Sequence, residues 1–263
     1  RSHVPGAVWV LQSWNENPRE VALKALDRGD CIVLDLFSDG DPKWQGGYCG
    51  HDFIWCMLPN FGGRTGIHGN LQGTMQGWFD ARKARPEAAV GIGAAPEGIG
   101  SDPVLYDALY ALPWMKDDEC GGWLDDYAYS RYGKKDSDLA EAWRLIAGSA
   151  LDCRTGQQGT SEPVVCARPG WGITGVSTWS TCEISYDTEA LRDAARLFLN
   201  AAPRFKGNEN YEHDLVNLVR QSVTDSSWFL YHDIEKAYKS GDKESFRRLS
   251  ARFLGMIEDL DAL

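Results

Sequence analysis

The sequence VGIGAAPEGIG at residues 90–100 decides how the first part of the chain folds. Its short apolar run with small residues is typical of a buried strand, and the glycines after it allow the backbone to turn sharply. Glu97 is therefore expected at a strand end, where parallel α/β proteins bind ligands and carry catalytic groups. Strand-end carboxylates also cap helices and pair with arginines, so a catalytic and a structural interpretation both stay open.

Three further strand-like runs precede this stretch, at residues 7–14, 31–37 and 53–58. Helices are expected after the first run, at about 18–27, and before the last strand, within 71–84. The alternation of strands and helices predicts a parallel sheet with crossover connections. Closing a barrel takes about eight strands, so four predict either an open sheet or the second half of a barrel.

The hydrophobic pattern becomes helical after residue 101, which predicts an all-α part behind the α/β part. A loop region at 154–181 is rich in Gly, Ser, Thr and Pro, with possible short strands at 164–165 and 175–176. The helices are expected at residues 104–112, 123–132, 139–150, 188–200, 210–238 and 244–260, each with its apolar stripe in the core.

Composition excludes some classes of function. The chain has 263 residues, of which 43% are hydrophobic and 25% charged, as in an ordinary globular protein. Its net charge of −11 argues against a general nucleic-acid or anionic-membrane binder, because such proteins need a basic surface. No apolar run reaches the length of a membrane span.

The seven cysteines form no CxxC pair and show no zinc-ligand spacing. Cys31 and Cys56 lie in strand-like runs and are expected to be buried thiols. Cys153 and Cys166 bracket a Gly-rich loop, so a disulfide between them is possible. The odd total leaves at least one thiol without a partner within the chain, and the redox compartment stays open.

Other catalytic motifs are missing from the sequence: it has no GxSxG elbow, no HExxH and no GK[ST] phosphate loop. We therefore expect neither a metal nor a cofactor. The carboxylates near strand ends remain, namely Glu16, Asp35 and Glu97. Glycoside hydrolysis needs two carboxyl groups that flank the glycosidic bond, about 5 Å apart in retaining enzymes.

Aromatic and amide side chains also stand near the predicted strand ends. Trp14, Trp55 and Asn60 suit a sugar pocket, since aromatic rings stack on pyranose faces and amides bind hydroxyls. For the two tryptophans, core packing is an equally good interpretation. Asp35 is assigned to substrate binding, with a buried, hydrogen-bonded structural carboxylate as the alternative.

Four motifs in this order resemble a known family: VWVLQSW, IVLDLF, FIWCMLPNFGG and GAAPEG, at residues 8–14, 32–37, 53–63 and 93–98. They are similar to the α-N-acetylglucosaminidases of glycoside hydrolase family 89, bacterial members in particular. SRYG, EAWRLI and CARP extend the similarity into the helical part, so it covers nearly the whole chain.

The resemblance implies a retaining exo-glycosidase that removes terminal α-linked N-acetylglucosamine from glycans. It implies a (β/α)8-type barrel followed by an α-helical domain. Residues 1–100 would then be the C-terminal part of the barrel, and 101–263 an incomplete helical domain. Glu97 matches the nucleophile of the family, and Trp14 matches a tryptophan of its sugar pocket.

The chain departs from the family pattern at the acid/base residue. In the family this glutamate follows an asparagine upstream of the VWVLQSW strand, and nothing before Ala7 supplies it. Glu16 also follows an asparagine, but it lies after the next strand, so the role is not transferred to it. The loop at 154–162 also lacks the pocket histidine of the animal protein. We therefore expect an internal fragment that is inactive in isolation.

Two other hypotheses stay open. The chain is either a complete, different glycosidase that uses Glu16 and Glu97, or a non-catalytic glycan-binding protein. The partner expected from the resemblance is a glycan ending in α-N-acetylglucosamine, and the location is outside the cytoplasm: exported in a bacterium, lysosomal in an animal. No nucleic acid or membrane partner is expected, and the oligomeric state is open.

Overall fold

The computed structural model describes residues 4–62, 64–98, 102–116, 120–153 and 159–263. The chain forms two compact units. The sheet unit holds the residues up to 123 and the segment 151–159, and the helical unit holds 124–150 and 160–263. Helix α3 (Pro103–Ala111) belongs to the sheet unit, and the expected domain division at residue 100 stays a prediction.

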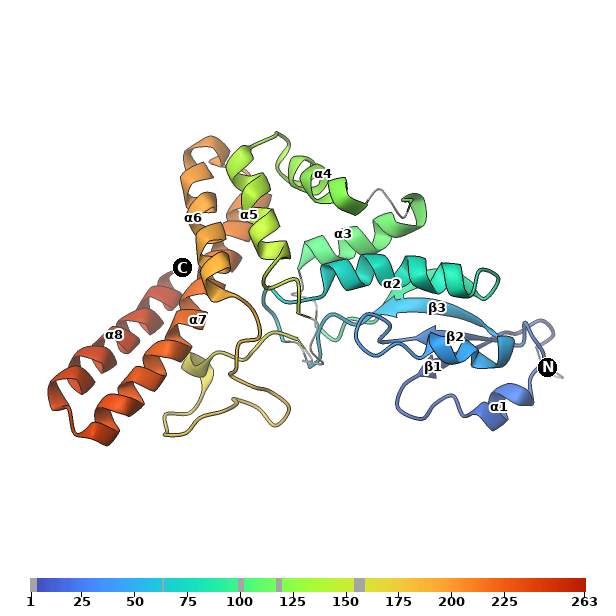
Figure 1. The fold of residues 1–263 in the computed structure, drawn as a ribbon, viewed down its shortest axis with the longest axis horizontal. Coiled ribbons are helices and arrows are strands. Elements are labelled where there is room, and N and C mark those ends of the chain that lie inside the picture. Colours follow the sequence, from blue (N-terminus) through green and yellow to red (C-terminus); the bar gives the residue numbers. More distant parts are fainter. Residues whose placement is uncertain (1–3, 63, 99–101, 117–119, 154–158) are drawn as a thin grey trace. The chain divides into compact units, whose positions relative to one another are not determined.

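The sheet unit is built on four parallel strands in the order β1-β2-β3-β4. Figure 1 labels the first three of them. Because all four run the same way, their carboxyl ends meet at one edge of the sheet. The predicted α/β arrangement is thereby confirmed. The strands are β1 (Trp9–Ser13), β2 (Cys31–Asp35), β3 (Asp52–Met57) and β4 (Ala89–Ala94), and the connections contain α1 (Glu20–Lys24), the 3-10 segment η1 (Trp44–Gly50) and α2 (Leu71–Ala84).

One face of the sheet is buried. Phe53, Trp55 and Met57 of β3 alternate onto this face and are inaccessible to solvent. Helix α2 packs against it so closely that a Cβ atom on Gly77 would lie 3.0 Å from the Trp55 ring. Trp44 of η1 stacks on Phe53 at 6.4 Å between ring centroids, so η1 covers the same face where a crossover helix is missing.

The opposite face of the sheet is less buried, and β4 presents the small residues Gly91 and Gly93 to its neighbour β3. A Cβ atom on Gly91 would lie 3.1 Å from Cδ1 of Ile54, and one on Gly93 would lie 3.1 Å from Sγ of Cys56. The glycines of β4 therefore leave room for the side chains of β3. In a closed barrel this face points inward. The interior is then crowded with side chains, and glycine is favoured on a strand where a neighbouring side chain needs the space.

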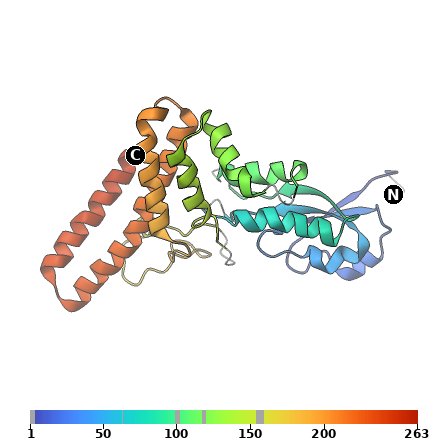
Figure 2. The same ribbon diagram turned by 45° about the horizontal axis from the view of Figure 1, so that its top comes forward.

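The helical unit consists of helices joined by short turns, apart from the long connection between α5 and α6 that contains the 3-10 turn Val164–Cys166 (Figure 2). The side chains of Asp187, Asn208 and Asp242 accept hydrogen bonds from the first-turn amides of α6, α7 and α8. Gly241 takes a φ of 74° between α7 and α8, which lets α8 fold back along α7. The helices are α4 (Cys120–Tyr132), α5 (Ser137–Ala147), α6 (Thr188–Phe205), α7 (Glu209–Ser240) and α8 (Lys243–Ala262).

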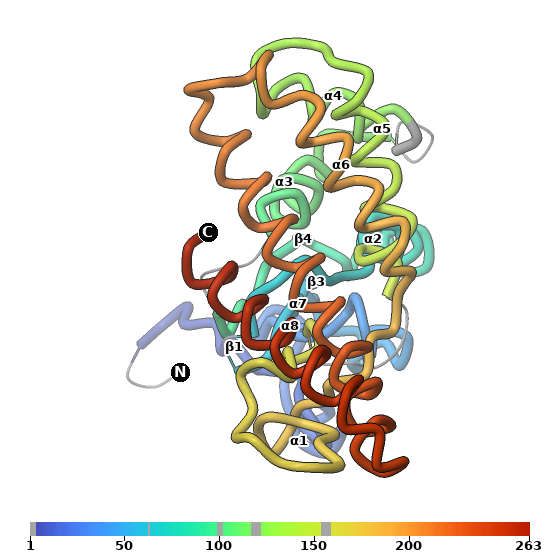
Figure 3. The backbone as a smooth tube through the Cα atoms, turned by 90° about the vertical axis from the view of Figure 1, so that its left-hand side faces the viewer, coloured from blue at the N-terminus to red at the C-terminus, as the bar shows by residue number. Residues whose placement is uncertain are grey.

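Aromatic rings fill the centre of the helical unit, where α5, α6 and α7 lie side by side (Figure 3). Phe198 stacks on Tyr211 at 5.7 Å, and Tyr132 meets both rings edge-on. Next to them, Asp214 forms an ion pair with Arg131 and accepts a hydrogen bond from Tyr132. The predicted apolar stripe of α6 is thus buried, at Leu191, Ala195 and Phe198. The prediction does not hold for α8, which has no fully buried residue because it packs mainly on α7. Tyr238, in the predicted stripe of α7, is 56% exposed.

Some local predictions are wrong. Residues 164–165 lie in a 3-10 turn, Val164–Cys166, and 175–176 form no strand. Pro163 precedes the turn, and Val176 donates its amide to the Ser180 hydroxyl, so neither pair meets a strand partner. Cys153 and Cys166 are free thiols, so the possible disulfide is not formed. Cys31 and Cys56 are buried thiols, as expected.

Helix α7 also carries a buried carboxyl group, Asp225, which accepts a hydrogen bond from the Tyr186 hydroxyl at 2.8 Å. Burial raises its pKa to about 7. The folded state therefore binds a proton more tightly than the unfolded state, and stability falls as the pH rises from about 4 to about 7.

We predict that Asp225→Asn raises the free energy of unfolding at pH 8 by at least about 1 kcal/mol and leaves it nearly unchanged at pH 4. Asparagine can still accept the Tyr186 hydrogen bond but carries no charge. Urea unfolding at both pH values measures the effect. Asp193→Asn, in an exposed pair with Arg196, is the control and should change stability by less than about 0.5 kcal/mol. An equal effect of Asp225→Asn at both pH values would contradict the prediction.

Candidate active site

The candidate site lies at the carboxyl ends of β3 and β4. Parallel pairing continues past β4, because the Ala95 amide donates to the Met57 carbonyl at 2.8 Å. Glu97 follows directly and is exposed. Its Oε2 atom accepts a hydrogen bond from the Gly62 amide at 2.8 Å. The structure thus places Glu97 where the sequence predicts, with its carboxylate oriented by the main chain.

The segment after β3 makes a second contact with the same loop. Oδ1 of Asn60 accepts a hydrogen bond from the Gly98 amide at 3.1 Å. Asn60 is only 4% exposed, whereas a residue that mainly binds substrate would present its amide to solvent. Gly62 has a φ of 59°, the left-handed region that favours glycine, and this conformation goes with the amide contact to Glu97.

An aromatic cluster joins the ends of the first three strands. Trp14 packs on Phe61 at 5.7 Å between centroids, and Phe37 meets Phe61 edge-on at 5.3 Å. Phe61 is buried, while Trp14 remains 38% exposed. An exposed indole that is held in place by packing on a buried ring suits stacking on a sugar ring. Phe61 and Gly62 stand in the FIWCMLPNFGG motif, but nothing in the motif indicates these contacts.

The carboxylate of Asp35 has no exposed surface and points to backbone groups of the connection to β3. Its Oδ2 atom accepts hydrogen bonds from the Lys43 amide at 3.0 Å and the Trp44 amide at 2.6 Å. Burial raises the pKa of this carboxyl group, while these bonds favour the ionised form. The structure gives Asp35 the structural arrangement considered as the alternative, and its substrate-binding role stays a prediction.

Trp55 and Glu16 are the other two residues considered from the sequence. Trp55 is fully buried under α2, away from solvent, so its assignment to a sugar pocket has no support from its position. Glu16 is exposed in the loop after β1. Its pairing with Glu97 as a second carboxylate stays a prediction.

A small cavity near the same strand ends, with some polar side chains in its wall, was not expected. It measures about 30 Å³ and is lined in part by Asp39, His68 and Thr74. Burial raises the pKa of Asp39 to about 7. The hydrogen bond from the Leu58 amide, at 2.9 Å, acts in the opposite direction and lowers the pKa, but it is the smaller effect. Burial lowers the pKa of His68 to about 4, so the ring is neutral at pH 7. The space is sufficient for a water molecule between polar groups.

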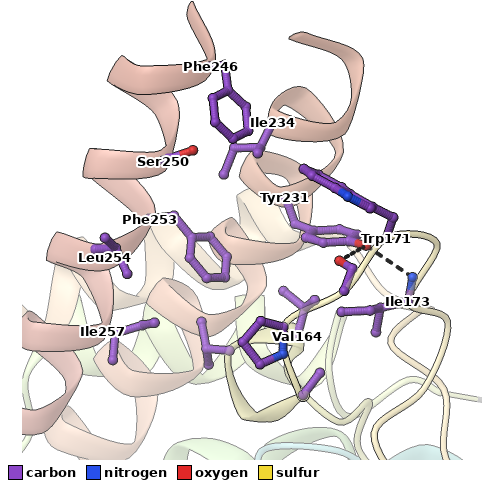
Figure 4. A pocket seen from close by; sticks show the side chains of 14 residues that line it. Val164, Trp171, Ile173, Tyr231, Ile234, Phe246, Ser250, Phe253, Leu254 and Ile257 are labelled. Carbon is purple, nitrogen blue, oxygen red and sulfur yellow. Dashed lines mark hydrogen bonds between the residues drawn. The ribbon is translucent and has the colours of Figure 1, made fainter. Parts of the chain in front are cut away.

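A separate cavity of about 510 Å³ lies within the helical unit, between α7, α8 and the 164–173 loop (Figure 4). Its walls are mostly apolar and include Trp171, Phe246 and Phe253. The Tyr231 hydroxyl donates to the Gly170 carbonyl and accepts from the Ile173 amide, both at 3.1 Å. These bonds fix the loop, and the lining brings no carboxylate or histidine for catalysis.

Two absences concern only the described residues. Their His, Cys, Asp and Glu side chains form no group of three or more that could hold a metal ion. Among the helices of this part of the chain, none is both long and apolar enough to cross a membrane.

Two family models match the chain. Residues 1–116 match the α-N-acetylglucosaminidase (NAGLU) TIM-barrel domain, and residues 123–263 match the C-terminal domain of the same family. The parallel sheet with a carboxylate at its strand ends, followed by helices, is thus the architecture of a TIM-barrel glycoside hydrolase. The chain belongs to the α-N-acetylglucosaminidase family, as the resemblance of its four motifs implied.

Known proteins agree with this assignment. The chain is 33% identical to human α-N-acetylglucosaminidase over 257 residues, 92% of this chain and 34% of the human protein. A family 89 glycoside hydrolase from Clostridium perfringens, solved with 2-acetamido-1,2-dideoxynojirmycin, superimposes with a TM-score of 0.90 at 33% identity. That match covers 98% of this chain and 29% of the solved one. The chain therefore spans about a third of the length of these relatives.

A variant of the Clostridium perfringens enzyme with two Glu-to-Gln substitutions has been solved in complex with its substrate, GlcNAc-α-1,4-galactose. This structure has a TM-score of 0.90 and 32% identity to the chain, and the match covers 98% of this chain and 29% of the other.

We predict that Asp35→Ala lowers the free energy of unfolding by about 2–3 kcal/mol, because the buried Trp44 amide and the partly buried Lys43 amide lose their acceptor. Asp35→Asn keeps one oxygen for them and should cost less. Urea unfolding measures both, with Asp41→Ala, at an exposed ion pair, as a near-neutral control. An Asp35→Ala variant with full stability but a raised KM in the full-length enzyme would instead support substrate binding.

Proposed function

We propose that the chain is a segment of a retaining exo-glycosidase that releases terminal α-linked N-acetylglucosamine from glycans, with Glu97 as the nucleophile. The observation that carries this proposal is the exposed Glu97 carboxylate at the end of β4, fixed by the Gly62 amide. Membership of the α-N-acetylglucosaminidase family supports it. So does the substrate of the Clostridium perfringens relative, which ends in N-acetylglucosamine.

The chemistry follows from one carboxylate on each side of the glycosidic bond. Glu97 attacks the anomeric carbon from the face opposite the leaving oxygen, which takes a proton from a second carboxyl group. The α-glycoside becomes a β-linked glycosyl-enzyme. The second group, now a carboxylate, removes a proton from water, which attacks the same carbon and releases the sugar with its original α configuration.

The second carboxyl group is proposed to lie upstream of residue 1. The two glutamates replaced in the Clostridium perfringens variant are more than a hundred residues apart in sequence. If Glu97 corresponds to the later of them, the earlier one precedes this chain. A fragment with one carboxylate of two is then expected to lack turnover.

The sugar itself is proposed to stack on Trp14, whose indole is exposed at 38% and supported by Phe61. Asp35, Trp55 and Asn60 are weaker candidates for sugar contacts because all three are buried. For the whole protein we propose export from a bacterial cell, or a lysosomal location in an animal.

In the full-length enzyme, we predict that Glu97→Gln lowers kcat by on the order of 10⁴-fold or more, because an amide cannot form the glycosyl-enzyme. The measurement is hydrolysis of an aryl α-N-acetylglucosaminide, with mass spectrometry of protein trapped by a fluorinated substrate. Glu87→Gln, whose side chain is exposed and paired only at the surface, is the control and should keep normal activity. Undiminished turnover by Glu97→Gln would remove Glu97 from the mechanism.

If the second carboxyl group lies upstream as proposed, the chain of 263 residues alone should show little or no hydrolysis of the same substrate. Turnover at a rate typical of intact glycosidases would contradict the fragment proposal and favour a complete enzyme. Loss of that turnover in Glu16→Gln would then identify Glu16 as the second carboxylate. Sugar binding without turnover in the full-length protein would indicate a non-catalytic glycan-binding protein.

A further inference from the structure

The nucleophile proposed above is held from two sides by one short segment, residues 60–62. The Gly62 amide donates to Oε2 of Glu97 at 2.8 Å. Oδ1 of Asn60 accepts from the amide of Gly98, the residue after Glu97, at 3.1 Å. The first bond fixes the side chain of Glu97, and the second fixes the backbone immediately after Glu97, at Gly98.

The segment is itself well anchored. Asn60 is 4% and Phe61 9% exposed, so neither side chain is free to reorient in solvent. A Cβ atom on Gly159 would lie 3.5 Å from Cβ of Asn60, which shows how closely the chain at Gly159 packs on it. Phe61 contacts Trp14 and Phe37, so the segment is also tied to the ends of β1 and β2.

We propose that Asn60 is a positioning residue for Glu97, rather than a group that binds the sugar; this inference rests on the proposed role of Glu97 as nucleophile. The Asn60 oxygen holds the Gly98 amide and so sets the direction in which Glu97 leaves β4. Attack on an anomeric carbon requires a carboxylate oxygen at a fixed distance and angle, and a misplacement of about 1 Å can cost on the order of 10²-fold in rate.

The two possible roles use different atoms of the side chain. A positioning role needs the oxygen that accepts from Gly98, whereas a sugar contact through the amide nitrogen needs a donor. Asn60→Asp keeps an oxygen and loses the donors, and Asn60→Ala removes both. The positioning role therefore predicts that aspartate, but not alanine, preserves most of the rate.

In the full-length enzyme, Asn60→Ala should lower kcat by about 10²-fold while KM changes less than about threefold. Asn60→Asp should stay within about tenfold of the parent kcat, with the acidic limb of its pH profile moved to higher pH by the added negative charge. Asn200→Ala, an exposed position in α6, is the matched control and should behave as the parent.

Binding separates positioning from sugar contact. In an inactive Glu97→Gln background, adding Asn60→Ala should leave the affinity for GlcNAc-α-1,4-galactose within about threefold, as measured by calorimetry. A loss of tenfold or more would overturn the proposal and make Asn60 a sugar contact, as would an unchanged kcat in Asn60→Ala. If Asn60→Ala does not fold, the kcat and pH profile of Asn60→Asp decide, and a 10²-fold loss of kcat there overturns the proposal. An active Glu97→Gln single variant would refute the proposed function itself, independently of Asn60.

Discussion

The parallel pairing of β3 with β4 determines where Glu97 stands. Ladder bonds between parallel strands fix the two chains in register, and here the pairing runs on to Ala95, beyond the end of the strand. Residues 60–62 and 97–98 therefore leave the sheet side by side and can bond to each other. The glycines of β4 favour this pairing, because a Cβ atom at Gly91 or Gly93 would lie 3.1 Å from Ile54 or Cys56, and the neighbouring side chain would have to shift to make room. The position of the Glu97 carboxylate therefore depends on the pairing of β4 with β3, and this pairing is favoured by the small residues of β4.

Much of this arrangement could be predicted from the sequence. The strands, their parallel order and the exposed position of Glu97 follow from apolar runs separated by helical segments. The positions of Trp55 and Asp35 could not be predicted in this way. Both faces of a parallel sheet are apolar, so the alternation of side chains along a strand does not show which face a helix covers. Trp55 alternates onto the face under α2, and Asp35 turns to amides in the irregular η1 segment, for which sequence patterns give no warning.

The helical unit shows the same limit. Its helices are predicted from their apolar spacing, whereas the adjacent valines Val164 and Val165 favour extended structure locally and indicate a possible short strand where the structure has a 3-10 turn. A strand also needs a neighbour to pair with, and that information is tertiary. The burial of Asp225 beside the partly buried Tyr186 likewise becomes visible only once the elements are packed, since each residue alone is an ordinary surface residue in sequence.

The contact between Gly62 and Glu97 is made by a peptide N–H group, not by a side chain. Replacing side chains one by one with alanine would leave that group in place, so a conventional mutational scan would not detect the contact directly. Only a change to the peptide linkage itself, such as an ester in place of the amide, removes the donor without a new side chain. Natural variation around Gly62 can disturb the site by moving the path of the chain, and among the natural residues only proline at this position would remove the N–H group itself.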